Sequence, residues 1–239
     1  MSLPGSSRSA GGQNNTTVPR PLLAMVTDRR LYGSGSAAND VDEKACTTLV
    51  AATAAAACAG VDLVQVRERG LNDVSLLALA VRVREAIAAT GARLVVNDRI
   101  DIALAARADG VHLPGRAVSC ARVRAIVPYG FLVGRSVHSE DEALAAARDG
   151  GCDYLVFGSV FESPSKPAGH SVAGLEALAR VCAAVQLPVL AIGGITAARV
   201  PDVVRTGAAG IAAIGLFATA REHELREIVS QIRLAFGAS

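Results

Sequence analysis

The sequence of 239 residues lacks a large excess of charge of either sign. It contains 24 Lys and Arg against 22 Asp and Glu, which gives a formal net charge of +2. Proteins that bind nucleic acid or an anionic membrane over a broad surface are usually strongly basic. We therefore expect no nucleic-acid or membrane partner, and any binding of anions must come from local geometry.

Long apolar runs are also absent. No stretch of 18 or more apolar residues occurs, so no membrane span is predicted. The first 20 residues are rich in Gly, Ser, Asn and Pro and lack the apolar core of a signal peptide. We expect residues 1–20 to be a disordered tail, because they have little apolar surface to offset the entropy cost of ordering. Residues 21–239 are expected to form one domain.

The five cysteines form no recognisable motif. They are scattered singly, without a C-x-x-C pair or another short metal-ligand spacing. A dispersed, odd set fits a reducing cytosol and small buried side chains better than a disulfide framework. We therefore predict a cytoplasmic location, and structural roles for Cys46, Cys58, Cys120, Cys152 and Cys182.

Eight short apolar runs alternate with longer helical stretches rich in Ala, Leu and Arg. Most of the runs are continuously apolar, as is typical of parallel strands buried on both faces. Eight β/α units in one domain predict an α/β fold, a single (β/α)8 TIM barrel, and a doubly wound sheet is the less favoured alternative. The predicted strands span residues 22–27, 62–68, 93–98, 109–114, 131–137, 153–158, 188–193 and 209–215. The helical stretches include residues 42–60, 73–90, 139–150, 171–185, 196–207 and 219–237.

Polar residues follow the second and third runs, where a barrel of this kind carries its functional groups. Gln65, Arg67 and Arg69 alternate, so they are expected to share a face, and two guanidinium groups suit a carboxylate or a phosphate. Arg67 could instead pair with Glu68 or with Asp98. Asn97 and Asp98 could orient a substrate, bind a metal or balance the arginines.

A histidine stands where the fifth run meets a helical pattern, in GRSVHSEDEA (134–143). His138 is either a capping or core residue or a group that moves protons, and its place at a strand end favours proton transfer. His112 also ends a run, and packing and function stay open for it. Ser136 and Ser159 are further candidates for binding substrate.

Glycines end the seventh and eighth runs, where barrels often bind a phosphate through backbone N–H groups. Gly193 and Gly194 allow close approach of the backbone, and Ile214 and Gly215 stand at the matching place after the eighth run. A plain tight turn is the alternative. Together, the two glycine ends favour a phosphate site.

One long loop follows the sixth run, FESPSKPAGHSVAG (161–174). Ser163, Ser165 and Lys166 supply hydroxyl groups and a cation suited to a phosphate, and Gly174 lies at the far end of the loop. Long loops in compact domains are often functional. A solvated surface loop is the equally weighted alternative.

Taken together, several of these motifs resemble the thiamine-phosphate synthase/TenI superfamily over residues 22–218. They are TDRRLYG, QVRERG, VVNDRIDIALAARADGVHLP, GRSVHSEDEALAAARDGGCDYLVFGSVF, PVLAIGGI and GAAGIAAIG. The resemblance implies a barrel that binds a thiazole phosphate and is often a homodimer.

The synthase branch of the superfamily joins hydroxymethylpyrimidine diphosphate to thiazole phosphate, with Mg²⁺ held by two aspartates. Asp98 matches the first of these aspartates. The second lies in a motif like GQxD, where this chain has Pro114-Gly115-Arg116-Ala117. The TxTKK loop of the synthase is SPSKP here, with one lysine only. The resemblance to this branch is therefore incomplete.

The TenI branch is the closer match, through the LP turn, GRSVHS and VFG-x-VFE. Its members are thiazole tautomerases, which aromatise a thiazole carboxylate phosphate by moving a proton and need no metal. The resemblance makes His138 the general acid and base. The glycines would hold the phosphate, with Lys166 closing over it, and Arg67, Arg69 and Asn97 would line the acceptor end. Two departures are Gly215, where the family often has Ser, and Asp98, which some tautomerases lack.

Three hypotheses follow from these residues. A thiazole tautomerase without a cofactor leads, because of His138 and Ala117. A Mg²⁺-dependent thiamine-phosphate synthase is second, supported by Asn97-Asp98 and the QVRER motif. A non-catalytic regulatory barrel that binds a phosphate ligand is third.

Overall fold

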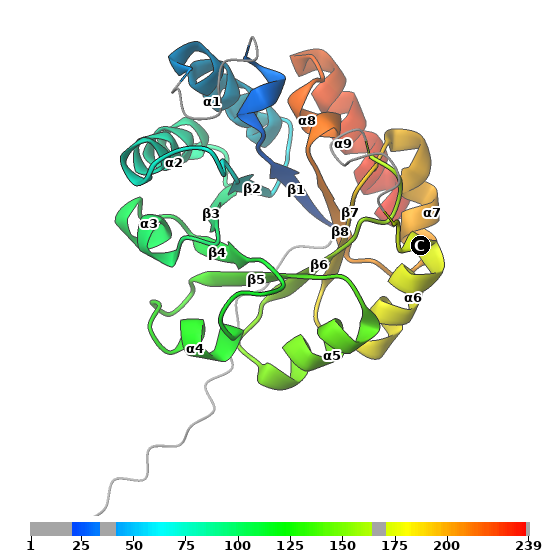
Figure 1. Ribbon diagram of the computed structural model, residues 1–239. Coiled ribbons are helices and arrows are strands. Elements are labelled where there is room, and N and C mark those ends of the chain that lie inside the picture. Colours follow the sequence, from blue (N-terminus) through cyan, green and yellow to red (C-terminus); the bar gives the residue numbers. More distant parts are fainter. Residues whose placement is uncertain (1–20, 34–41, 164–170, 238–239) are drawn as a thin grey trace, which may run out of the picture.

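The chain folds into a closed barrel of eight parallel strands surrounded by helices. A computed structural model describes residues 21–33, 42–163 and 171–237. Consecutive strands pair all the way round, and β1 closes the ring against β8. Figure 1 shows the strands at the centre and the helices outside them. The predicted (β/α)8 barrel is confirmed, whereas the predicted tail over residues 1–20 lies outside the described residues.

Each of the eight predicted apolar runs contains one strand. The strands are β1 (Leu22–Val26), β2 (Leu63–Val66), β3 (Arg93–Asn97), β4 (Gly110–Leu113), β5 (Leu132–Val137), β6 (Tyr154–Phe157), β7 (Val189–Ile192) and β8 (Gly210–Ala213). They are four to six residues long and mostly buried along their whole length. Continuous burial explains why these runs lack polar alternation.

The helices include the six predicted stretches and three short ones. The α-helices are α1 (Glu43–Cys58), α2 (Asp73–Ile87), α3 (Ile100–Ala105), α4 (Cys120–Arg124), α5 (Glu140–Asp149), α6 (Gly174–Ala184), α7 (Val200–Arg205), α8 (Gly215–Ala218) and α9 (Glu222–Gly237). Two 3₁₀ turns are η1 (Arg29–Leu31) and η2 (Ala197–Arg199). The helices α3, α4 and α8 have four to six residues, too few to show a helical period in the sequence.

Polar side chains fix where several helices begin. Asp42, Asn72, Ser119 and Ser139 each accept a hydrogen bond from a backbone N–H in the first turn of the helix that follows. Such caps satisfy N–H groups that the helix itself leaves unpaired. The cap at Ser139 starts α5 directly after His138, and so it fixes the backbone that carries this histidine.

The apolar core has an inner and an outer part. Inside the barrel, one cluster comprises Leu22, Ala24, Val26, Leu63, Val95, Leu132, Tyr154, Val156, Leu190 and Ala212. Two larger clusters fill the space between the strands and the helices. The inner cluster identifies which strand residues point into the barrel, because side chains alternate along a strand.

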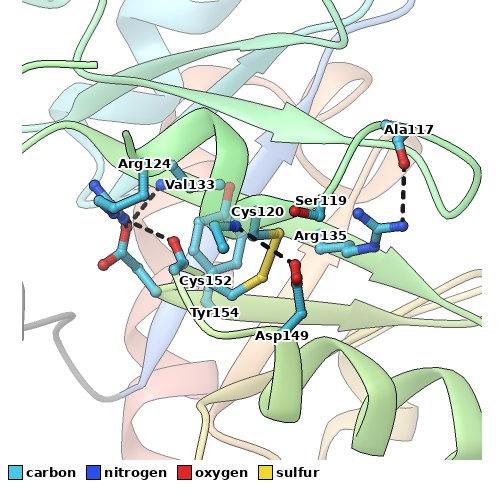
Figure 2. The surroundings of a disulfide bond; sticks show 12 residues. Ala117, Ser119, Cys120, Arg124, Val133, Arg135, Asp149, Cys152 and Tyr154 are labelled. Carbon is cyan, nitrogen blue, oxygen red and sulfur yellow. Dashed lines mark hydrogen bonds and ion pairs between the residues drawn. A yellow bond between two sulfur atoms is a disulfide. The ribbon is translucent and has the colours of Figure 1, made fainter. Parts of the chain in front are cut away.

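Two of the five cysteines form a disulfide, which corrects the sequence prediction. Cys120, the first residue of α4, is bonded to Cys152 between α5 and β6, with 5.6 Å between their Cα atoms. Figure 2 shows the bond with Asp149 beside it. A separation of 32 residues carries no local signature, and only the fold brings the two together. Cys58 is exposed rather than buried, whereas Cys46 is buried.

Within the described residues, none of the helices has the length and apolar character needed to cross a membrane.

Candidate active site at the carboxyl ends of the strands

Polar side chains line one side of the barrel interior, from β2 to β5. Gln65 pairs in register with Val26 and Val95, which belong to the inner cluster, so Gln65 also points inward. Its amide nitrogen donates to Asn97 Oδ1 at 3.1 Å. The structure therefore brings together Gln65 and Asn97, two of the predicted substrate-binding residues.

Next to this pair, a buried histidine contacts Ser136. His112 lies in register with Asn97, and its Nε2 is 2.9 Å from Ser136 Oγ. Its Nδ1 is 3.3 Å from the hydroxyl of Tyr154. Burial, aided by the charge of Arg67, lowers the pKa of His112 to about 3, so this imidazole is neutral at physiological pH. His112 is thus a buried polar residue next to the site and holds no charge there.

His138 follows Val137, the last residue of β5, and directly precedes Ser139, which caps α5. Its Nδ1 lies 2.6 Å from the carbonyl oxygen of Gly158, which can only accept, so Nδ1 carries a proton. Its backbone N–H donates to Glu142 Oε2 at 2.7 Å. In the neutral ring, Nε2 is therefore the atom with a free lone pair. The ring is fixed through one nitrogen and available through the other, as a proton-transfer group requires.

The loop after β4 lies against this histidine. A Cβ atom at Gly115 would be 3.7 Å from His138 Cδ2. Arg135 holds the loop in place by donating to the carbonyl groups of Gly115, Ala117 and Val118. Position 117, where the synthase motif has an aspartate, is thus occupied by a methyl group on a firmly held loop beside the site.

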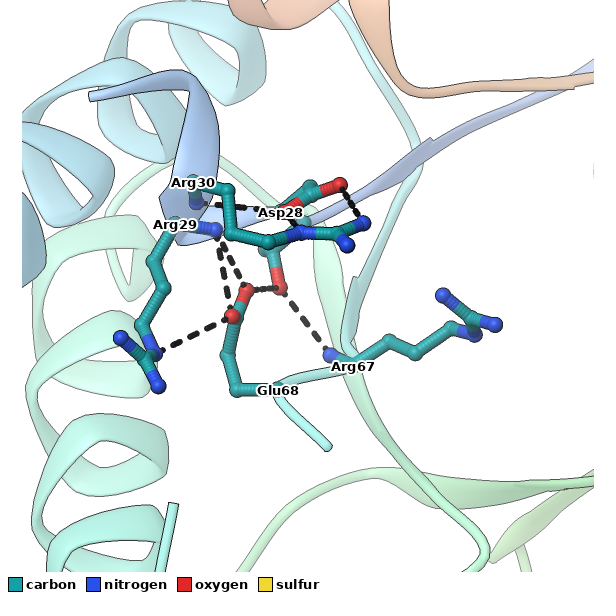
Figure 3. A network of polar contacts seen from close by, with 6 residues as sticks. Asp28, Arg29, Arg30, Arg67 and Glu68 are labelled. Carbon is teal, nitrogen blue, oxygen red and sulfur yellow. Dashed lines mark hydrogen bonds and ion pairs between the residues drawn. The ribbon is translucent and has the colours of Figure 1, made fainter. Parts of the chain in front are cut away.

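The carboxyl ends of β1 and β2 carry a compact polar network, shown in Figure 3. The Glu68 carboxylate accepts from Thr27 Oγ1 at 2.6 Å and from the backbone N–H of Arg29. Asp28 binds the guanidinium of Arg30 through both oxygens. Burial raises the pKa of Glu68, whereas the hydrogen bond from Arg30 lowers the pKa of Asp28.

Arg67 does not join this network through its side chain. Its backbone N–H donates to Thr27 Oγ1 at 3.0 Å, while in Figure 3 the side chain extends away from Glu68. Its guanidinium has no hydrogen bond or ion pair with any described residue, so neither Glu68 nor Asp98 is its partner there. Burial lowers the pKa of Arg67. A half-buried cation that no described carboxylate binds directly is suited to an anionic ligand.

Arg69 is exposed, and after burial its charge is the second cause that lowers the pKa of Arg67. Strand β2 ends at Val66, so the alternation that predicted a shared face for Arg67 and Arg69 does not extend to Arg69. A role of Arg69 in binding stays a prediction.

The glycines after β7 have backbone conformations that other residues rarely adopt. Gly193 has φ = 102° and Gly194 has φ = 63°. A Cβ atom at Gly193 would lie 2.7 Å from Ser159 Cβ, and one at Gly194 would lie 2.2 Å from the carbonyl oxygen of Glu162. Both glycines therefore allow the end of β7 to pack against the segment after β6. This packing agrees with the tight-turn alternative and leaves the phosphate site a prediction.

The matching glycine after β8 is open. Gly215 begins α8, with Ile214 in the capping position, and no atom lies within 4 Å of where its Cβ would be. The backbone N–H of Gly215 has no acceptor among the described residues. A ligand phosphate could approach this backbone closely.

The long loop after β6 is described only in part. Ser163 is half-buried, and Gly174 begins α6 with φ = 79°. Ser165 and Lys166 lie outside the described residues, and their predicted contacts with a phosphate stay predictions. At the described end of the loop, the backbone N–H of Ala173 donates to the carbonyl oxygen of Ser159 at 2.8 Å.

Comparison with known proteins identifies the family of the chain. The model of the thiamine monophosphate synthase family matches residues 40–217. The chain belongs to this family.

Relatives in the family align with the chain over three quarters or more of their own length. The thiamine-phosphate synthase of Methanoculleus marisnigri is 46% identical over 159 residues, which are 66% of this chain and 75% of the relative. That of Chloroflexus aurantiacus is 36% identical over 213 residues, 87% of this chain and 96% of the relative. The solved thiamine phosphate pyrophosphorylase from Pyrococcus furiosus superposes with a TM-score of 0.73 at 30% identity, covering 91% of this chain and 96% of that one.

The chain is therefore a member of an enzyme family of thiamine biosynthesis. The names of these relatives favour the synthase, which the sequence analysis placed second, over the tautomerase, which it placed first. The names describe whole proteins at 30–46% identity. Which reaction this chain catalyses depends on the residues at its own site.

A synthase of this family would be expected to hold Mg²⁺, and the residues of this rim do not fit a two-aspartate site. Asp98 is exposed, has φ = 64° and offers a carboxylate that no described residue binds. Ala117 offers none, and Arg116 beside it adds positive charge. The nearby carboxylates of Asp28 and Glu68 are already engaged. Only one of the two expected oxygen ligands is present.

Sequence reasoning missed three residues that shape this site. Tyr154 lies in an apolar run, and its reach to His112 depends on the inward face of β6. Arg199 donates to the carbonyl oxygen of Gly194 at 2.7 Å and lies over the ring of Phe161, 4.7 Å from its centre. Thr27 bridges Glu68 and the backbone of Arg67. The sequence carries no local signal for the first of these, because Tyr154 and His112 are 42 residues apart.

Proposed function

We propose that the chain is a thiazole tautomerase of thiamine biosynthesis, which aromatises a thiazole carboxylate phosphate by transferring a proton through His138. The observation that carries this proposal is the fixed ring of His138, with Nδ1–H bound to the Gly158 carbonyl and Nε2 left as the free base. The reaction moves one proton within one substrate. It needs no metal, nucleophile or second substrate.

The geometry gives each residue a simple task. Nε2 of His138 takes a proton from one carbon of the substrate and returns it to another. The carbonyl oxygen of Gly158 accepts from Nδ1–H throughout, and it stabilises the imidazolium formed between the two steps. Arg67 attracts the anionic end of the substrate, and the backbone at Gly215 faces the phosphate.

The proposal is tested by replacing His138 with Gln. We expect turnover of the thiazole carboxylate phosphate, measured without metal, to fall by about 10²–10⁴-fold. Binding of the aromatic thiazole phosphate, measured by calorimetry, should change little, because the phosphate contacts remain. The matched control is His223→Gln, at an exposed position in α9, which should keep full activity. Full activity of the His138→Gln variant would refute the proposal.

A thiamine-phosphate synthase is the second candidate, supported by the names of the relatives and by Asp98. It predicts coupling of hydroxymethylpyrimidine diphosphate to thiazole phosphate when Mg²⁺ is supplied, and loss of that coupling in Asp98→Asn. Coupling without isomerisation would overturn the tautomerase and establish the synthase. Binding with neither reaction would identify a non-catalytic regulatory barrel.

The expected homodimer is retained as part of the proposal and is tested by sedimentation.

A further inference from the structure

Three polar side chains form a line inside the barrel, from Tyr154 through His112 to Ser136. Tyr154 and His112 are 1% and 3% exposed, whereas Ser136 is half-buried. The contacts are 3.3 Å from the Tyr154 hydroxyl to His112 Nδ1 and 2.9 Å from His112 Nε2 to Ser136 Oγ. The line thus starts deep in the barrel and ends at the site.

Stability alone does not account for this line. Elsewhere the barrel interior is filled by apolar residues such as Leu22, Val26 and Leu190. Buried polar groups gain little over well-packed apolar ones and are destabilising when a partner is lost. Their presence on the side of β4 and β5 that leads to the site therefore indicates a task at the exposed end.

The backbone of β5 is adapted to let Tyr154 reach His112. A Cβ atom at Gly134 would lie 2.2 Å from Cζ and 2.4 Å from the hydroxyl oxygen of Tyr154. The tyrosine ring therefore occupies the place of a side chain on β5, and it contacts His112 on β4 from β6. The ring centres of His112 and Tyr154 are 5.7 Å apart.

The hydrogen bonds along the line have a direction. A neutral imidazole donates through one nitrogen and accepts through the other. The low pKa of His112, caused by burial, keeps it neutral. The hydroxyl proton of Tyr154 has no acceptor among the described residues other than His112 Nδ1, and a buried O–H without an acceptor is destabilising by about 1–3 kcal/mol. Tyr154 therefore donates to Nδ1, and Nε2–H donates to Ser136.

We infer that His112 and Tyr154 are positioning residues, which fix the Ser136 hydroxyl as a hydrogen-bond donor toward the bound ligand. Because Ser136 Oγ accepts from Nε2–H, its own proton points to a ligand atom. That atom must be an acceptor, such as a ring nitrogen or a carboxylate oxygen. His138, two residues later in the chain, offers a hydrogen-bond acceptor instead, through its free Nε2.

This pair of groups sets the orientation of the substrate. An acceptor atom binds at Ser136, and the carbon that loses its proton lies at His138, which follows the end of the strand. A ligand bound in the reverse orientation would place its acceptor atom against the lone pair of His138 Nε2, which is unfavourable. The inference deepens the proposed function and rests on it for the identity of the ligand, but the direction of the hydrogen bonds is independent of it.

Nuclear magnetic resonance tests the direction without any activity. In long-range ¹H–¹⁵N spectra of the labelled protein, the His112 signals are those that disappear in His112→Gln and shift in Tyr154→Phe. We expect His112 to carry its proton on Nε2 and to show no titration between pH 8 and pH 5. A proton on Nδ1, or a charged ring in this range, would overturn the inference.

A double-mutant cycle tests the link to the ligand. The probe is the aromatic thiazole carboxylate phosphate, with Kd measured by calorimetry. We expect Ser136→Ala to weaken binding about tenfold and Tyr154→Phe about threefold. Phe keeps the ring beside Gly134, so this variant is expected to fold.

The decisive comparison is Tyr154→Phe in the Ser136→Ala background. We expect no further weakening there, because the residue through which Tyr154 acts is gone. An additive threefold loss would show that Tyr154 only supports the structure, and would overturn the inference. If the protein does not bind the probe, the proposed function fails, whereas the direction of the hydrogen bonds is still decided by the tautomer of His112.

Discussion

The two ends of the barrel use charged residues in opposite ways. At the amino ends of the strands, Asp62, Asp109 and Asp153 each accept from the backbone N–H of the second residue in the preceding strand, at 2.7–2.8 Å. At the carboxyl ends, Arg67 has no carboxylate partner among the described residues. The aspartates of the amino end hold neighbouring strands together, whereas the carboxyl end has paired carboxylates and also keeps a cation available for a ligand.

The aspartate contacts at the amino end occur in three of the four successive strand pairs. The three aspartates precede β2, β4 and β6, so they clamp three strand pairs in turn. The equivalent residue before β8 is Ala209, which has no carboxylate. The strand pair with the two glycine ends therefore lacks the clamp that the other three pairs share. The comparison teaches that carboxylates at the end away from the site serve to join neighbouring strands.

The largest expected effect is on stability at the amino end. The side chain of Asp153 is 6% exposed. It binds both Val133 N–H and Arg124, with 2.6 Å between Asp153 Oδ2 and Arg124 Nη2. Replacing Asp153 with Asn leaves the charge of Arg124 without its partner. We expect unfolding in denaturant to show a loss of about 3 kcal/mol.

The control for that substitution is Asp202→Asn, which removes an exposed ion pair with Arg205 and should change stability by less than about 0.5 kcal/mol. Affinity for the thiazole phosphate should be unchanged in both variants. A loss of affinity with unchanged stability in Asp153→Asn would mean that Asp153 serves binding rather than stability, contrary to the comparison.

The next effect concerns pH and the buried His112. Its folded pKa of about 3 lies below its ordinary value of 6.5. Between these two pH values the unfolded chain binds a proton at His112 and the folded chain does not. The contribution to stability is complete above pH 6.5 and is lost as the pH falls toward 3, by at most about 1.4 kcal/mol per pH unit.

Unfolding of the wild type and of His112→Gln at pH 7 and pH 5 measures this contribution. We expect the wild type to lose about 2 kcal/mol more than the variant between these values. Equal losses would mean that the folded protein protonates His112 as readily as the unfolded chain does, so that burial does not lower its pKa.

The smallest effect on stability is expected for Arg67. Because no described residue pairs with its guanidinium, Arg67→Met should change the free energy of unfolding by less than about 0.5 kcal/mol. The affinity for the thiazole phosphate should fall at least about tenfold, because a charge-assisted contact is lost. Arg226→Met, at an exposed position in α9, is the control. A large loss of stability in Arg67→Met would mean that Arg67 stabilises the fold, as the aspartates at the amino ends of the strands do.

The sequence allowed the barrel to be predicted because each buried parallel strand is a short run of apolar residues. It also placed Gln65, Asn97, Ser136 and His138 near the carboxyl ends of strands. In a parallel barrel all these ends lie at the same rim. For Arg67 and Arg69 the expected shared face stays a prediction, because alternation applies only within a strand and β2 ends at Val66.

Contacts between distant segments could not be predicted. The bond between Cys120 and Cys152 depends on how α4 lies against the end of α5. The contact of Tyr154 with His112 crosses the intervening strand β5. Neither partner carries a local signal of the other. The choice between the two reactions of the family also rests on such a detail, a single side chain at position 117.

The glycine at position 134 gives a rule for reading other sequences. An aromatic ring at position 154 can turn toward β4 only if β5 has no side chain in its way, so the two positions must change together. A relative with Ala or Val at the place of Gly134 is expected to have a smaller residue at the place of Tyr154. Where both positions differ, the line to Ser136 is broken. The residues at positions 134 and 154 would then divide members of the family according to how they orient their ligands.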